Sequence, residues 1–393
     1  MLFFLKKYTK FFLWGIFSPI LIYVFTQKKT KIIVWRVDRF GHLALNTHLF
    51  LIRQKLSLNK EGADRYMFLA PRKNISNAFL FNMFVEYIRS NKFDSVLTSN
   101  FLYYLAQVFK TDLEKTKILY QMEYKSREKE FSLGVKTVDF GMNHKEKAES
   151  ILLKMNIHPN DKVVSVYARD SSFLTSVNGE EDWGYHDYRD SDIGNYLKAI
   201  KHLIKLGYKV VRIGSQYSKS LNYESENYIE YNLSGFKSDF MDVYLASRSE
   251  FIVGSRSGAT DVSLIFGTPL LVVNSTTFME SPLGKKDLFI QKKIQKKNEV
   301  LNFKDIIDKE EYYLFSGLEL KNKFNMEYIE NTENEILHAV IEMNNKLNGE
   351  EYDTDQKKLL NRYFNEFCNR NKWSNRNAPI SIGWLQENYS SYL

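Results

Sequence analysis

The sequence is poor in cysteine and proline, and each shortage excludes a class of protein. Its 393 residues include a single cysteine, Cys368, and six prolines. One cysteine cannot form a disulfide framework or a cysteine-based zinc cluster, and it favours a reducing compartment. Low-complexity tracts are also lacking. With 44% hydrophobic and 26% charged residues, the composition is that of a globular protein, and the length allows two or three domains.

Several common motifs are missing as well. No G-x-x-x-x-G-K-[ST] loop occurs, which argues against a P-loop NTPase, and no G-x-S-x-G elbow marks a serine hydrolase. The first βα loop is not G-x-G-x-x-G, which argues against a dinucleotide dehydrogenase. No basic helix or RNA-binding aromatic signature supports a nucleic-acid partner. The net charge of +8 still favours anionic partners, without choosing between a membrane surface and a nucleotide.

The amino-terminal apolar run is too short for an ordinary transmembrane helix. Residues 11–25 are apolar, but a span needs about 20 such residues and this run contains Pro19. No small-residue cleavage site follows, which argues against a signal peptide. Lysines flank the run on both sides, so we expect residues 1–30 to contact an anionic membrane surface. This predicts a peripheral or singly anchored protein at the cytoplasmic face of the inner membrane. The alternative is an N-terminal helix packed on the protein's own core.

Residues 31–155 alternate short apolar strands with helices. Helical spacing of Leu45, Leu49 and Ile52 predicts a helix over 43–56. Such alternation predicts an α/β domain with a parallel sheet. We expect strands at 31–36, 66–70 and 95–97, a second helix at 78–88, and a linker at Asn156–Asp161.

The pattern then starts again in a second α/β domain, residues 156–325. A helix over 191–206 has a start signal at Asp190 or Ser191 and a stop at Gly207. We expect its other helix at 240–246 and its strands at 163–167, 209–214, 251–253 and 270–273. A fourth part, residues 326–393, is expected to pack across the domains as helices over 326–347 and 355–372 with a short tail from 383.

The segment from Val253 to Thr260 is the most informative in the chain. An apolar strand breaks into Ser255, Arg256, Ser257 and Gly258 and then starts a helix. Free backbone N–H groups at a helix start favour an anion such as phosphate, and glycine allows close approach. The segment therefore predicts a phosphate site. The alternative is the tight βα turn that any parallel α/β domain contains.

Two arginines follow other strands of the same domain. Ligands of open α/β sheets bind beyond the carboxyl ends of the strands, which places the loops at Arg169, Gly214 and Ser255 on one side of one cleft. A guanidinium suits a diphosphate because it binds two oxygens and stays charged. We therefore predict that Arg169, Arg212 and Gly214 contact the diphosphate, although Arg212 can instead pair with a surface carboxylate.

Five stretches together resemble a family of bacterial glycosyltransferases found with surface-polysaccharide and lipopolysaccharide genes. Their order and spacing carry the resemblance, which covers roughly residues 30–280. The second half is also distantly similar to heptosyltransferases, whose donor diphosphate sits at a comparable Ser-Gly helix start. The matching stretches are 39–43, 188–193, 207–214, 255–258 and 269–274.

This resemblance implies a GT-B-like fold, with two Rossmann-like open parallel-sheet domains facing a cleft. It implies a nucleotide-sugar donor, a glycan or lipid-linked glycan acceptor, and no further cofactor. In that layout the loop with Asp38 and His42 faces the acceptor, and His42 is our candidate base. The related heptosyltransferases carry an Asp after a Gly at this place, so His42 departs in residue type. It can instead cap the next helix or bind the acceptor, and Asp38 is the alternative base.

Asp190-Ser191-Asp192 has the D-x-D form that holds a metal in other glycosyltransferases. At a helix start, capping and the helix dipole already explain acidic residues, so we expect no metal site. Two rival functions stay open: a sugar-nucleotide 2-epimerase, and a non-catalytic assembly protein that keeps the fold. A soluble epimerase needs no membrane segment, so residues 1–27 argue against the first rival.

Overall fold

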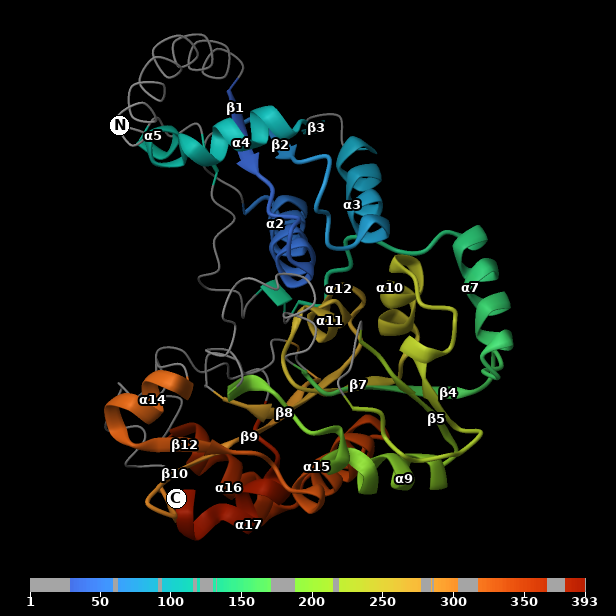
Figure 1. Cartoon of the computed structure of the whole chain (residues 1–393), viewed down its shortest axis with the longest axis vertical. Helices are drawn as coiled ribbons and strands as arrows, with labels where there is room; N and C mark the ends of the chain where they lie inside the picture. The colour runs from blue at the N-terminus through green and yellow to red at the C-terminus, as the bar shows by residue number, and fades with distance from the viewer. Residues whose placement is uncertain are drawn as a thin grey trace. The chain divides into compact units, whose positions relative to one another are not determined.

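The computed structural model forms two compact units. Unit 1 comprises Met1–Ser126 and Val135–Val138, and unit 2 comprises Arg127–Gly134 and Asp139–Leu393 (Figure 1). The residues that the structure describes are 29–58, 63–90, 94–115, 119–120, 130–131, 133–170, 188–214, 219–276, 284, 286–302, 317–365 and 379–392.

Unit 1 is built on a three-stranded parallel sheet in the order β1-β2-β3, which confirms the predicted parallel α/β character of this region. The strands are β1 (Thr30–Val34), β2 (Arg65–Ala70) and β3 (Asp94–Thr98). The helical segments are a π-helical turn η1 (His42–Asn46), α2 (Thr47–Lys55), α3 (Ala78–Ser90), α4 (Asn100–Val108) and α5 (Lys110–Lys115).

Trp35 anchors the loop that follows β1. Its ring is fully buried and packs edge-on against Phe68 of β2, with 5.1 Å between the ring centroids. Its indole N–H donates a 2.7 Å bond to Thr47 Oγ1 at the start of α2. Both ends of the loop Arg36–His42 are therefore fixed to the core of unit 1.

Unit 2 contains a six-stranded parallel sheet in the order β6-β5-β4-β7-β8-β9. The chain starts in the middle at β4, runs outward to β6, and returns to continue from β7. This is the strand order of a doubly wound, Rossmann-like sheet. The strands are β4 (Lys162–Tyr167), β5 (Tyr208–Arg212), β6 (Tyr228–Glu230), β7 (Phe251–Gly254), β8 (Leu270–Ser275) and β9 (Leu288–Gln291).

Helices join the strands of unit 2, and one of them starts later than its sequence predicted. The cap is Asp192, whose side chain accepts a 2.8 Å bond from Gly194 N, so the predicted caps Asp190 and Ser191 were wrong. Gly207 ends the helix as predicted, at a φ of 88°. The segments are α7 (Met142–Lys154), η3 (Ile193–Tyr196), α9 (Leu197–Lys205), η4 (Tyr231–Leu233), α10 (Asp239–Arg248), α11 (Gly258–Asp261) and α12 (Ser263–Phe266).

The start of unit 2 lies upstream of the boundary that we placed at 155/156. Helix α7 belongs to unit 2, and the stretch Asn156–Asp161, which we interpreted as a linker, joins α7 to β4 inside that unit. Asn156 adopts a left-handed φ of 58°, which turns the chain out of the helix. A polar helix end therefore explains the composition of this stretch.

The C-terminal part is more regular than its sequence predicted. Its first residues form a strand and not a helix, because they pair antiparallel with β10. Residues 383–392, predicted as a tail, lie in a helix whose Trp384 is fully buried. Helix α15 of this part packs on α9, β8 and β9. The elements are β10 (Lys293–Lys296), β11 (Glu299–Val300), α14 (Gly317–Phe324), β12 (Met326–Ile329), α15 (Glu333–Leu347), α16 (Thr354–Tyr363) and α17 (Ile382–Tyr392).

Of the predicted membrane segment, residues 1–30, residues 1–28 lie outside the described residues. Of the helices that the structure describes, none has both the length and the apolar character needed to cross a membrane.

Candidate functional site

The candidate site lies where β4 and β7 of unit 2 run side by side. The chain leaves β4 toward one edge of the sheet and leaves β7 toward the other, so this is the topological switch point of the sheet. Gly254 pairs with Tyr167 in the register of the two strands. A Cβ atom at Gly254 would lie 2.3 Å from Tyr167 O, so only glycine permits this approach.

Two predicted site residues meet at this switch point. Arg169 follows β4 and Ser255 follows β7, and the Arg169 backbone N–H donates to Ser255 Oγ at 3.4 Å. Ser255 N donates in turn to Tyr167 O at 3.2 Å. Both Arg169 and Ser255 are buried. The tertiary structure thus joins two loops that lie more than eighty residues apart in the sequence.

Asp190 is part of this site, although its sequence indicated only a helix cap. Its carboxylate forms a short ion pair with the Arg169 guanidinium, and its backbone oxygen accepts a 2.6 Å bond from Lys292 Nζ. The first acidic residue of the D-x-D stretch, Asp190, therefore pairs with a cation. The signal that could have identified it is an acidic residue shortly before a helix, in the segment that follows the strand after which Arg169 lies.

The helix start at Ser257 and Gly258 is largely closed by its own side chains. Ser257 Oγ accepts from Ala259 N at 3.2 Å, and Ser257 N donates to Thr260 Oγ1 at 3.0 Å. This capping box occupies two of the backbone N–H groups that we expected an anion to use. Helix α11 is also only four residues long. Side chains of the surrounding strand ends therefore dominate the chemistry of the site.

Arg256 is held within its own turn. Its Nε lies 3.0 Å from Asp261 Oδ1, and both side chains are nearly buried, at 9% and 12% exposed. Its backbone oxygen accepts a 3.2 Å bond from Arg189 Nη2. Arg189 therefore ties the segment before Asp190 to the loop after β7.

Buried hydroxyl groups support the floor of the site. Tyr196 OH lies 2.9 Å from Ser191 Oγ, which accepts a 2.7 Å bond from Asn274 Nδ2. Burial raises the pKa of Tyr196 to about 12, so its hydroxyl stays neutral. Burial likewise raises the pKa of Tyr167, whose hydroxyl bonds to the Ser257 side chain. Neutral hydroxyls add hydrogen bonds here without adding negative charge.

Arg212 and Gly214 stand apart from this group in their bonding. Arg212 is 1% exposed and pairs with Glu230, with 3.2 Å between Nη1 and Oε1. Its Nη1 also donates to Lys219 O at 2.9 Å. Glu230 accepts further bonds from Tyr228 OH and Leu221 N, both at 3.0 Å. Arg212 therefore pairs with a carboxylate, as the alternative stated, but Glu230 is only 14% exposed and is not a surface residue. Gly214 adopts a φ of 138°, a conformation that favours glycine.

The predicted acceptor residues belong to unit 1. His42 opens the π-helical turn η1, is half-buried, and its Nδ1 lies 3.5 Å from Asn46 Nδ2. The N-cap position is Gly41, so His42 does not cap the helix. Asp38 is exposed, and its Oδ1 lies 3.9 Å from Arg36 Nε. The two candidate bases thus differ in burial, with His42 the more enclosed.

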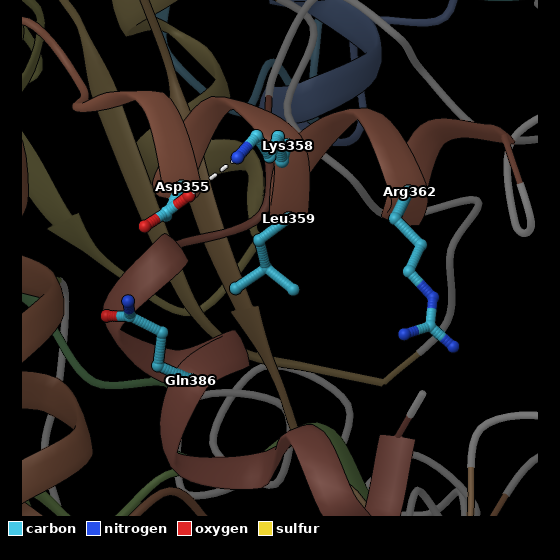
Figure 2. Close-up of a pocket in the computed structure, with 5 residues that line it drawn as sticks. All are labelled: Asp355, Lys358, Leu359, Arg362 and Gln386. Carbon is cyan, nitrogen blue, oxygen red and sulfur yellow. Dashed lines mark hydrogen bonds and ion pairs between the residues drawn. The ribbon is translucent and has the colours of Figure 1, made fainter.

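A separate cavity of about 460 Å³ lies between α16 and α17 of unit 2 (Figure 2). None of the residues that line it comes from β4, β7 or the loops after them. A 2.9 Å ion pair joins Lys358 to Asp355 at its rim. The lining residues are Asp355, Lys358, Leu359, Arg362 and Gln386. Within the described ranges, no three His, Cys, Asp or Glu side chains gather closely enough to hold a metal ion.

Solved structures of glycosyltransferases are among those similar to this chain. The family 9 glycosyl transferase of Veillonella parvula is 11% identical with a TM-score of 0.36, covering 67% of this chain and 85% of that protein. The ADP-heptose LPS heptosyltransferase II of E. coli is 13% identical with a TM-score of 0.39, covering 66% and 90%. No protein-family model and no curated protein matches the chain. Both scores are low, so neither likeness assigns a function to this chain.

Proposed function

We propose that the protein is a metal-independent glycosyltransferase that uses a nucleotide-diphosphate sugar. In this proposal unit 2 binds the donor, and the acceptor is a growing surface polysaccharide or lipopolysaccharide, lipid-linked at the membrane. The observation that carries the proposal is the junction of Arg169 and Ser255 at the β4–β7 switch point. Ligands of open α/β sheets bind at this place.

The charge at the switch point supports an anionic ligand. Among the described residues, basic side chains from Arg169, Arg189, Arg256 and Lys292 bond to groups around the strand ends, and Asp190 and Asp261 pair with Arg169 and Arg256. The charge of Arg256 also acts on the buried carboxyl of Asp287. Basic side chains in a buried setting favour a diphosphate, because few water molecules screen their charge.

The proposed reaction assigns a role to each group. The acceptor oxygen forms a bond to the anomeric carbon of the donor sugar, while the bond from that carbon to the diphosphate breaks. The leaving diphosphate takes the electron pair, and its charge is stabilised by Arg169. A guanidinium has five N–H donors, so pairing with Asp190 is compatible with a phosphate ligand. His42 accepts the proton of the acceptor hydroxyl, with Asp38 as the alternative base.

The order of the sequence motifs favours transfer over the rival functions. An epimerase or a non-catalytic relative would share the Rossmann-like sheet of unit 2, so the fold does not separate them. The stretches around 39–43 and 255–258 resemble those of glycosyltransferases in the same order. The apolar and basic residues 1–30 further suit an enzyme whose acceptor is held at a membrane.

Calorimetric titration with UDP, GDP, CMP and ADP tests donor binding. We expect one nucleotide to bind the wild-type chain, and Arg169→Ala to weaken its binding by about tenfold or more. Arg362→Ala, in the cavity between α16 and α17, is the matched control and should bind normally. Absence of binding by any nucleotide, or loss of binding in the Arg362 variant alone, would contradict the proposal.

A further inference from the structure

Unit 1 exposes an unusual group of large apolar side chains. Phe101 and Tyr104 of α4 are 61% and 67% exposed, and Leu97 and Leu102 are each 39% exposed. Phe101 and Tyr104 are three residues apart, so they share one face of the helix. The opposite side of α4 is anchored by buried Ala106. A surface helix normally presents polar residues to water, so this face departs from the usual pattern.

Leu97 extends the exposed group from the helix onto the sheet. In the register of the parallel strands, Val34 pairs with Leu69 and Leu69 pairs with Leu97. Residues in register point to the same face, and α4 packs on this face over β1 and β2. Because β3 is the edge strand, Leu97 remains uncovered. We call Leu97, Phe101, Leu102 and Tyr104 the α4 patch.

Cations border the α4 patch. Arg72 binds the start of α4, with its backbone N 2.7 Å from Asn100 Oδ1 and its Nε 3.0 Å from Thr98 O. Lys73 is exposed beside it. The two stretches that meet here, 71–77 and 98–104, contain no acidic residue. Exposed aromatic residues with basic neighbours have the composition of a surface that binds anionic lipid headgroups.

The α4 patch adjoins the loop that carries Asp38 and His42. Both follow the carboxyl ends of parallel strands in one sheet. The loop after β2 contacts each of them, because Arg72 binds the start of α4 and Ser76 N donates a 2.8 Å bond to Val37 O. Tyr103 of α4 also lies near Asp38. Burial raises the pKa of its phenol, and the negative charge of Asp38 adds to this effect.

We propose that the α4 patch docks unit 1 on an anionic lipid surface, in addition to any contact made by residues 1–30. Docking in this orientation brings the loop with Asp38 and His42 to the lipid surface, where the loop would meet an acceptor hydroxyl carried by a lipid. Only the identity of that acceptor rests on the proposed function. The lipid contact follows from the exposed aromatic residues and their basic border.

The single native cysteine allows a site-specific test in the full chain. Cys368→Ser with Tyr104→Cys can be labelled with an environment-sensitive NBD dye. Vesicles of phosphatidylcholine with phosphatidylglycerol should shift its emission to the blue and increase its intensity, and pure phosphatidylcholine should do so much less. Adding Lys73→Glu should weaken the response at least about fivefold, because it replaces an attractive charge by a repulsive one. The matched control places the cysteine at Leu233 of unit 2, which is 66% exposed.

Each outcome of this test decides the inference. Unchanged emission at position 104 on anionic vesicles would overturn it, even if residues 1–30 bring the chain to the vesicle. An equal response at Leu233 would show non-specific adsorption and would also overturn it. A blue shift that grows with protein concentration without lipid would identify a second copy of the chain as the occupant. Nucleotide binding, measured separately, decides the proposed function independently of these results.

Discussion

Asn274 and Asn331 bind each other reciprocally. The backbone N–H of each donates to the side-chain oxygen of the other, at 2.6 Å and 2.7 Å. Asn274, the second-last residue of β8, adopts a left-handed conformation with a φ of 57°, and its amide donates to Ser191. Asn331 follows β12 and is fully buried. The pair therefore connects the C-terminal part of unit 2 to the segment that places Asp190 beside Arg169.

Asn331→Ala should destabilise the protein and weaken nucleotide binding together. It removes the bond from Asn274 N to the Asn331 side chain and the bond from Asn331 Nδ2 to Gln291 O. Both losses leave buried polar groups unpaired, at a cost of about 1–3 kcal/mol for each. Asn388→Ala is the control, since Asn388 is also buried but bonds within α17 and to Glu335. Thermal unfolding should show a lower melting temperature for both variants. Calorimetry should show weaker nucleotide binding only for the Asn331 variant. Equal nucleotide affinity in all three proteins would refute a positioning role.

Gly254→Ala should separate β4 from β7. The added methyl group would lie 2.3 Å from Tyr167 O, so the strands or the loop must move. Overpacking of this kind costs about 1–3 kcal/mol or more. Gly141→Ala is the control, because a Cβ at Gly141 meets no atom within 4 Å. Urea unfolding that gives the same free energy for both variants would disprove the close approach at the switch point.

His42→Ala should lower the rate of sugar transfer with little change in donor affinity. Loss of a general base reduces turnover on the order of 10²-fold or more. The assay follows labelled sugar into the membrane lipid fraction, and the exposed His158→Ala serves as the control. If donor affinity falls while turnover at saturation is kept, His42 serves binding and Asp38 becomes the candidate base.

Asp287 should make stability depend on pH. Burial raises the pKa of its carboxyl from an ordinary 3.8 to about 6, although Leu270 N and Gly284 N donate to it. Because the pKa of Asp287 is higher in the folded state, its protonated form stabilises the fold. This stabilisation is fully present below the unfolded-state pKa and is lost as pH rises through about 6. Relative to Asp287→Asn, the wild type should lose at most about 3 kcal/mol between pH 4 and 6. Urea unfolding of both proteins across this pH range measures the difference in the free energy of unfolding. The same pH dependence in both proteins would contradict the raised pKa of Asp287.

EDTA should leave nucleotide binding and sugar transfer intact. Asp190 pairs with Arg169, and Asp192 accepts from Gly194 N and lies 3.1 Å from Lys219 Nζ. Both carboxylates are thus engaged by donors that a metal ion would have to displace. Transfer that stops in EDTA and returns with Mg²⁺ or Mn²⁺ would show that a metal is required.

Seven strands of the two parallel sheets could be predicted from the sequence because local patterns determine them, whereas the short strands β6 and β9 and the helices α4, α5 and α7 were not predicted. The run 270–273 is continuously apolar, the run 163–167 is interrupted only by Ser165, and Gly207 stops its helix through a left-handed φ. The prediction failed for Met326–Ile329, because only pairing with β10 makes this short segment a strand. Local propensity is weak over four residues, so a distant partner decides.

At the candidate site, the sequence by itself determined which residue types end the strands, including Arg169, Ser255 and Arg212. It did not determine which of these meet. Tertiary structure decided that Arg169 joins Ser255 and Asp190, whereas Arg212 joins Glu230 beside β6. The physical reason is strand order: the return of the chain from β6 to β7 places distant loops together, and no local pattern of residues records that crossover.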